Sequence, residues 1–180
     1  MKRIIAILMA VVMLLAFASC AKNPANEETS TEADVQNSVE ETSEAAAGDT
    51  VAKTLAAEFK ALAATETDAQ AIADKLCQSA AVSAIGPATM PVESGFLTGF
   101  DNAEITGFDK GVMFAPMIGT IPFVGYVFTL ADGTDAAAFV KTLEDNANLR
   151  WNICTQADEM VTVAEGNVVF FVMAPASLDA

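Results

Sequence analysis

The sequence contains no histidine. This absence excludes the Ser-His-Asp triad, the Cys-His nucleophile pair and the HExxH zinc site, because each of them needs an imidazole. The chain also lacks the G-x-S-x-G and glycine-rich phosphate-binding motifs. A site built only from carboxylates, or from serine and lysine, is not excluded. Carboxylate-based hydrolysis therefore stays open as an activity.

Basic residues are also scarce. Nine Lys and Arg residues stand against 24 Asp and Glu residues, and the formal net charge is −15. Nucleic-acid binding needs a basic patch, so we expect no nucleic-acid partner. An anionic membrane surface would repel the chain as a whole, so membrane attachment requires an anchor other than charge.

The first twenty residues, MKRIIAILMAVVMLLAFASC, have the organisation of a signal peptide. Lys2 and Arg3 form a basic start, and residues 4–17 form an uncharged apolar run. At ~1.5 Å per residue this run is too short to cross a ~30 Å hydrocarbon core comfortably as a permanent helix. We therefore expect residues 1–19 to be a cleaved signal peptide.

The small residues Ala18 and Ser19 precede Cys20 directly. This ending resembles the lipobox of bacterial lipoproteins, with Phe17 where leucine is usual. The resemblance implies that Cys20 is acylated, becomes the new N-terminus and holds the protein on the extracytoplasmic face of the cell membrane. The alternative is an ordinary secreted protein with an incidental cysteine.

Residues 20–49 are predicted to be the lipidated cysteine followed by an acidic, disordered tether. From residue 21 to residue 49 the chain has eight acidic residues, one basic residue and only two larger aliphatic residues, Val35 and Val39. Such a segment buries too little apolar surface to offset the entropy of ordering. As a coil it would span about 30 Å on average.

Residues 50–180 have the length and apolar content of a single globular domain. Apolar spacing, caps and turn residues predict helices over 51–64, 68–79 and 135–147, with Thr50 or Asp49, Thr67 and Thr134 as caps. They also predict strands over 103–108, 112–117, 123–130, 159–165 and 168–174, and a loop over 84–99.

The order of these elements predicts an α+β fold. We expect two N-terminal helices, an antiparallel sheet of four or five strands, and one further helix, packed mainly on one face. The strand 168–173 is apolar throughout, so we expect it to lie centrally with both faces covered.

The pattern "FVGYVFTLADGTDAAAFVKTLEDNANLRW…ADEMV…GNVVFFVMA" resembles a family of uncharacterised small lipoproteins of anaerobic low-GC bacteria. The resemblance covers roughly residues 103–174. In that family a strand leads into a helix, an aromatic segment and a final hairpin. It implies an envelope lipoprotein and carries no established activity.

Residues 112–130 contain no charge, and their connection PMIGTIP is apolar where a turn is usually polar. Met117, Ile118 and Ile121 could form an exposed apolar lip, stiffened by two prolines, that contacts a partner. Alternatively, the helices or the 84–99 loop fold over them and make them part of the core. Solvent exposure decides between the two interpretations.

Two cysteines remain beside Cys20. Cys77 and Cys154 could form a disulfide in an exported protein, or they could be two free thiols. Two cysteines without histidine make a poor zinc site.

The acidic residues do not form a metal motif. An EF-hand pattern is absent around Asp101, Glu104, Asp132 and Asp135, so helix-cap and turn roles are favoured for them. Asp158 and Glu159 are likewise read as turn residues. We expect no metal and no cofactor.

Arg150 and Trp151 follow the third predicted helix. An exposed pair of this kind could bind an anionic or planar ligand. The favoured interpretation is that Trp151 closes the end of the core while Arg150 lies along it.

Together these features predict a membrane-anchored, non-enzymatic binding or interaction domain of the cell envelope, with an unidentified envelope protein or ligand as its partner. The alternative is a carboxylate-based hydrolase or an accessory subunit of an envelope enzyme.

Overall fold

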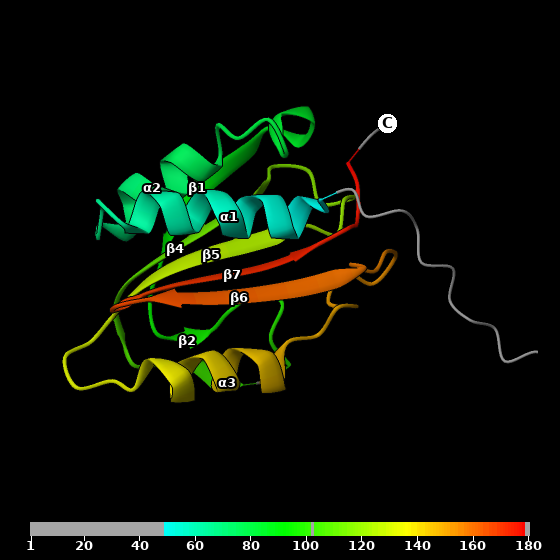
Figure 1. Ribbon diagram of the computed structural model, residues 1–180. Helices are drawn as coiled ribbons and strands as arrows, with labels where there is room; N and C mark the ends of the chain where they lie inside the picture. Colours follow the sequence, from blue (N-terminus) through cyan, green and yellow to red (C-terminus); the bar gives the residue numbers. More distant parts are fainter. Residues whose placement is uncertain (1–48, 102, 179–180) are drawn as a thin grey trace, which may run out of the picture. The chain divides into compact units, whose positions relative to one another are not determined.

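The centre of the fold is an antiparallel sheet with the strand order β1-β4-β5-β7-β6. A computed structural model describes residues 49–101 and 103–178 (Figure 1). In spatial order the five strands are β1 Pro87–Val92, β4 Phe108–Pro116, β5 Val124–Leu130, β7 Val168–Ala174 and β6 Glu159–Glu165. The predicted signal peptide, Cys20 and the tether up to residue 48 lie outside the described residues.

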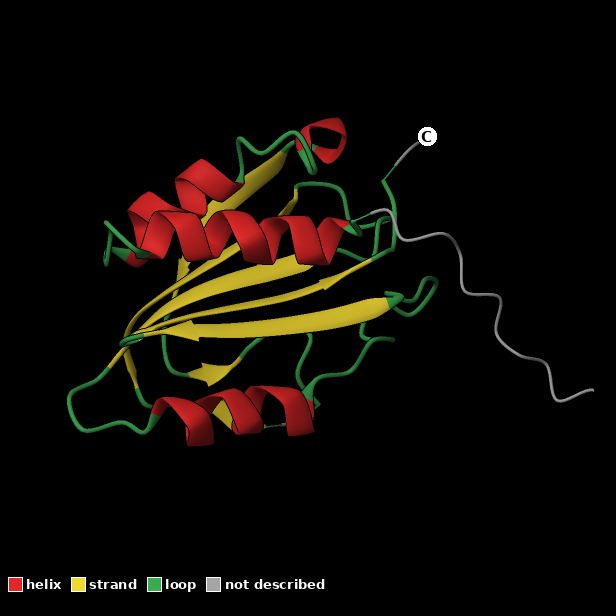
Figure 2. Ribbon diagram, in the orientation of Figure 1, coloured by secondary structure: helices red, strands yellow, loops and turns green. Residues whose placement is uncertain are grey.

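Helices cover both faces of this sheet, as the three layers in Figure 2 show. Helices α1 (Val51–Ala63) and α2 (Ala69–Leu76) pack on one face. Helix α3 (Ala136–Asn146) and a small antiparallel pair, β2 (Gly95–Phe96) with β3 (Glu104–Ile105), lie on the other face. A short 3₁₀ turn, η1 (Ser83–Ile85), leads from the helical layer into β1.

The predicted α+β class and the predicted strand β7 are confirmed. Strand β7 lies between β5 and β6, and all seven of its residues are buried. Two of the three helices, α1 and α2, pack on one face as expected, and α3 lies on the opposite face. The reason is that β5 and β7 are apolar on both faces, so both faces need cover.

Each face of the sheet carries its own apolar core. On the face of α1 and α2, the Phe59 and Phe170 rings stack with centroids 5.2 Å apart. On the face of α3, the Phe139 ring meets Phe128 edge-on at 5.3 Å. Alternation along β7 sends Phe170 to one core and its neighbour Phe171 to the other.

The helices begin at capped residues, although two caps differ from the prediction by one position. Thr50, one of the two predicted candidates, caps α1, whereas Asp68 and Asp135 cap α2 and α3 in place of the threonines that precede them. Asp68 accepts a hydrogen bond from the Ala71 N–H at 3.0 Å, and Asp135 accepts one from Ala138 at 2.7 Å. A carboxylate at the cap also interacts favourably with the helix dipole.

Strand β1 was not expected, because the predicted loop over 84–99 is rich in proline and glycine. It pairs with β4 so that Pro87 lies opposite Pro116 and Met90 lies opposite Met113. Because β1 is an edge strand, a proline whose missing N–H faces outward does not interrupt the ladder.

Gly125 in β5 leaves room for the ring of its cross-strand neighbour, Phe114. A Cβ atom on Gly125 would collide with Phe114 ring atoms, and Phe114 is fully buried. We predict that Gly125→Ala lowers the free energy of unfolding by about 1–3 kcal/mol, measured by urea denaturation. Gly119→Ala is the matched control, because a Cβ there meets no atom within 4 Å. Equal stabilities for the two variants would contradict this packing.

Candidate functional site

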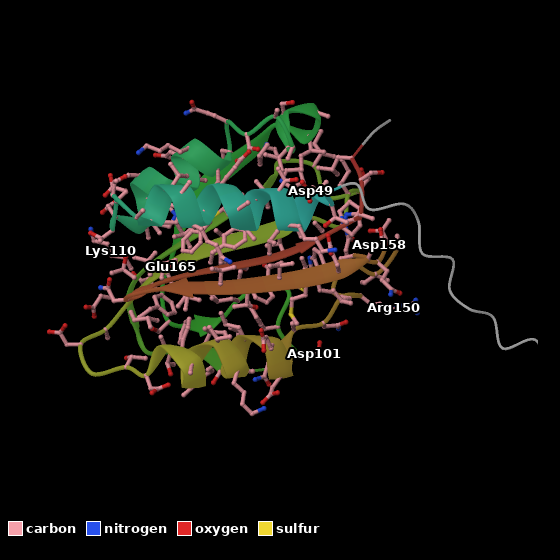
Figure 3. All side chains as sticks on the ribbon, in the orientation of Figure 1. Asp49, Asp101, Lys110, Arg150, Asp158 and Glu165 are labelled. Atoms are coloured by element: carbon pink, nitrogen blue, oxygen red, sulfur yellow. The ribbon has the colours of Figure 1, made fainter. Side chains whose placement is uncertain are left out.

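Four segments that are distant in the sequence meet at one end of the sheet. The first residue of β5, Val124, pairs with Met173 near the end of β7. Beyond β7, the carbonyl oxygen of Ala176 accepts a hydrogen bond of 3.2 Å from the N–H of Val51, the first residue of α1. The β4–β5 connection and the segment between α3 and β6 therefore lie at the same end as the start of α1. Figure 3 shows Asp49, Asp158 and Arg150 there, with Lys110 and Glu165 at the opposite end.

The β4–β5 connection exposes two of its three large apolar side chains. Met117 is 80% exposed and Ile118 is 77% exposed. Ile121 is half-buried and packs against the core under α1 and α2. Of the two interpretations of this connection, exposure favours the lip for Met117 and Ile118, and the core for Ile121. Residues 84–99 do not fold over the lip, because β1 pairs alongside β4 instead.

A second exposed apolar group stands beside the lip. The side-chain amide of Asn152 donates a hydrogen bond of 2.8 Å to the carbonyl oxygen of Gly119. This bond ties the loop after α3 to the lip through the residues next to Ile118 and Ile153, and Ile153 is 93% exposed. We call the group formed by Met117, Ile118 and Ile153 the apolar tip. The sequence did not single out Ile153, because residues 148–157 have no regular apolar spacing.

An apolar hollow of about 390 Å³ adjoins the tip. Met90 on β1, Met113 on β4 and Met117 on the lip line it, together with Ala88, Thr89, Ala115 and Pro116. No charged side chain lines this hollow, which we call the methionine groove. Methionine side chains are flexible and polarizable, so such a surface can adapt to apolar partners of different shapes. Met90 is 54% exposed, which is unusual for a large apolar residue in a strand.

A smaller hollow of about 160 Å³ lies under the lip and is lined by Trp151, Gly119 and Phe123 among others. Trp151 is half-buried against the core under α3, and Arg150 beside it is exposed. The position of Trp151 at the end of the core agrees with the favoured interpretation of this residue. Its ring also borders the hollow that opens beside the tip.

The hydroxyl group of Tyr126 lies under the groove. It donates a hydrogen bond of 2.8 Å to the Thr98 carbonyl oxygen and lies 3.3 Å from Sδ of Met113. Burial raises the pKa of Tyr126 far above its ordinary value, although the bond to Thr98 opposes this shift. The phenol therefore stays protonated at neutral pH, where it acts as a donor that holds Met113 and Thr98 in place.

The acidic candidates serve local structure. Asp101 accepts a hydrogen bond of 2.7 Å from the Asn148 amide, and Asp158 accepts one of 2.8 Å from the Ala176 N–H. Glu159, beside Asp158, has its Oε1 buried without a partner among the described residues. Within residues 49–101 and 103–178, no group of three or more Cys, Asp or Glu side chains is placed to hold a metal ion.

Cys77 and Cys154 are both free thiols in the structure. Cys77 follows α2 and packs partly buried against the core under α1 and α2, whereas Cys154 is exposed in the loop after α3. The two residues therefore belong to different layers of the fold, Cys77 to the layer of α1 and α2 and Cys154 to the loop between α3 and β6. The disulfide that the sequence left open is therefore not formed here.

Comparison with protein-family models, with curated proteins and with solved structures found no match. The resemblance to bacterial lipoproteins accordingly stays a prediction. In the part of the chain that the structure describes, no helix is both long enough and apolar enough to cross a bilayer.

The two thiols should differ strongly in reactivity. Burial, reinforced by the nearby Asp74, raises the pKa of the Cys77 thiol to about 11. At pH 8 only about 0.1% of Cys77 is then thiolate, the reactive form. In the Cys20→Ala chain we predict that iodoacetamide labels the exposed Cys154 at least ~100-fold faster than Cys77.

Peptide mass mapping measures the two labelling rates. As a control, both cysteines should react at similar rates in denaturant without a reductant. A denatured chain that takes up no label until it is reduced would show a disulfide and contradict the prediction.

Proposed function

We propose that this protein is a lipid-anchored interaction domain of the bacterial cell envelope, held at Cys20 on the extracytoplasmic face of the membrane. It works by contact through the lip and the methionine groove. The observation that carries this proposal is the apolar surface of Met117, Ile118 and Met90, exposed on a chain with a net charge of −15. Exposed apolar patches of this kind mark interaction sites.

The position of this surface adds support. It lies at the end of the sheet where α1 begins, and Asp49 is the described residue closest in sequence to Cys20. An anchor at Cys20 would therefore join the domain at the same end as the contact surface. A single acyl chain holds a protein only marginally, whereas the two or more chains implied by the lipobox resemblance hold it stably.

The anchor is tested by replacing the acylated residue. We predict that Cys20→Ala moves the protein from the membrane fraction to the soluble fraction, because the acidic remainder has no other strong attachment. Immunoblotting of fractionated cells measures this distribution, and Cys154→Ala is the matched control that should stay with the membrane. A Cys20→Ala protein that is processed at the signal peptide and still sediments with membranes would refute the anchor.

The contact surface is tested by crosslinking in living cells. We predict that a photoreactive amino acid at position 118 captures another cell component, since Ile118 is 77% exposed at the centre of the lip. The same amino acid at Lys141, which is exposed on α3, is the control. If position 118 gives no more adduct than position 141, the lip is not a contact surface.

A further inference from the structure

We propose that the component in contact with the lip is the lipid bilayer itself. Met117, Ile118 and Ile153 enter the boundary between headgroups and acyl chains of the membrane that holds Cys20. This inference rests on the proposed lipid anchor. The bilayer would be the partner of the lip, while the methionine groove beside the tip stays uncovered.

The tip residues are exposed and lie in loops, where insertion is sterically possible. Their three side chains are 80%, 77% and 93% exposed, and they belong to two loops rather than to a flat sheet face. The bond from Asn152 to Gly119 joins the two loops at the residues next to Ile153 and Ile118. A preorganised apolar group loses less side-chain and loop entropy on binding than two independent loops would.

The two loops that form the tip carry no acidic side chain. Residues 117–122 and 148–157 contain no acidic residue and one basic residue, Arg150, although the whole chain has a net charge of −15. An anionic bilayer would therefore not repel these loops directly. Asp49 and Asp158 lie at the same end of the sheet, so the orientation with the tip toward the membrane depends on apolar contact and not on charge.

The residues behind the tip suit the headgroup region. Arg150 is exposed, so its guanidinium can reach a lipid phosphate while its methylene groups lie along apolar surface. Trp151 lines the hollow under the lip, and tryptophan favours the level where one side is apolar and the other is wet. Apolar side chains in front, with Arg and Trp behind, match the layers of a membrane interface.

The predicted tether makes even a weak contact effective. It joins the described domain at Asp49, at the end of the sheet that carries the tip. A domain held by a tether of this length experiences the membrane at roughly millimolar effective concentration. Three apolar side chains therefore need only modest affinity to keep the tip at the bilayer.

Trp151 provides a direct test, because it is the single tryptophan of the chain. The mature chain, residues 20–180, is given an N-terminal hexahistidine tag and bound to vesicles of zwitterionic phosphatidylcholine with nickel-chelating lipid. Half of the vesicle samples carry acyl chains brominated near the headgroup. We expect the brominated lipid to lower Trp151 fluorescence by at least about twofold, because bromine quenches at contact and Trp151 would lie at the interface.

Two variants test whether the quenching depends on the tip residues or on any exposed apolar side chain. The double variant Ile118→Ser with Ile153→Ser should lose most of the quenching and keep its fold, because both residues are exposed. Phe96→Ser is the matched control, since Phe96 is 69% exposed on β2 and lines neither hollow. It should retain the quenching of the unchanged chain. Near-ultraviolet circular dichroism checks that all variants are folded.

The outcomes are decisive in both directions. No difference between brominated and ordinary vesicles would overturn the proposal, as would quenching that survives the double variant. A dimer in sedimentation without quenching would assign the tip to a second copy, and a protein adduct at position 118 without quenching would assign it to a protein. The tag replaces the lipid, so failure here leaves the Cys20 anchor untouched, and failure of the Cys20→Ala test leaves this result untouched.

Discussion

The structure depends on burying two adjacent strands, β5 and β7, on both of their faces. Six of the seven residues of β5 and all seven of β7 are buried. Few antiparallel strands are covered this completely, because one face of such a sheet is often left to water. The neighbours Phe170 and Phe171 show the consequence, since each requires a separate core. Helices on both faces follow from that requirement.

Helices cover both faces in the middle of the sheet, but one face is only partly covered near the edge strand β1. Helix α3 packs over β6 and β7, so the side of β1 and β4 that faces the same way is left partly open. Met90 and Met113 lie opposite each other on that open side. The apolar tip continues this surface beyond the end of the strands. The candidate site thus arises where the layers stop, and no catalytic cluster is needed to explain it.

The sequence predicted the elements with strong local signals and missed those set by tertiary contacts. Strands 159–165 and 168–174 were predicted to the residue, because apolar strands flank a Gly166-Asn167 turn. Strand β1 was missed because Pro87 and Pro91 normally end a strand, and only its place at the edge makes them acceptable. For the site, the lip was proposed from its apolar turn, but its exposure depends on where β1 runs. The loop of Ile153 is joined to the lip by the Asn152 bond, which no sequence pattern predicts.

The prolines of β1 also affect whether two copies of the protein can pair through this edge of the sheet. Alternate residues of a strand direct their amides to the same side, so Pro87, Thr89 and Pro91 share one direction. We expect this to be the outer side, because prolines facing β4 would leave gaps in the ladder. A strand of a neighbouring molecule that paired with this edge would then have one hydrogen-bond donor, the N–H of Thr89. A continuous ladder would need three. Two copies of the protein that meet at this edge would therefore not extend one sheet into the next.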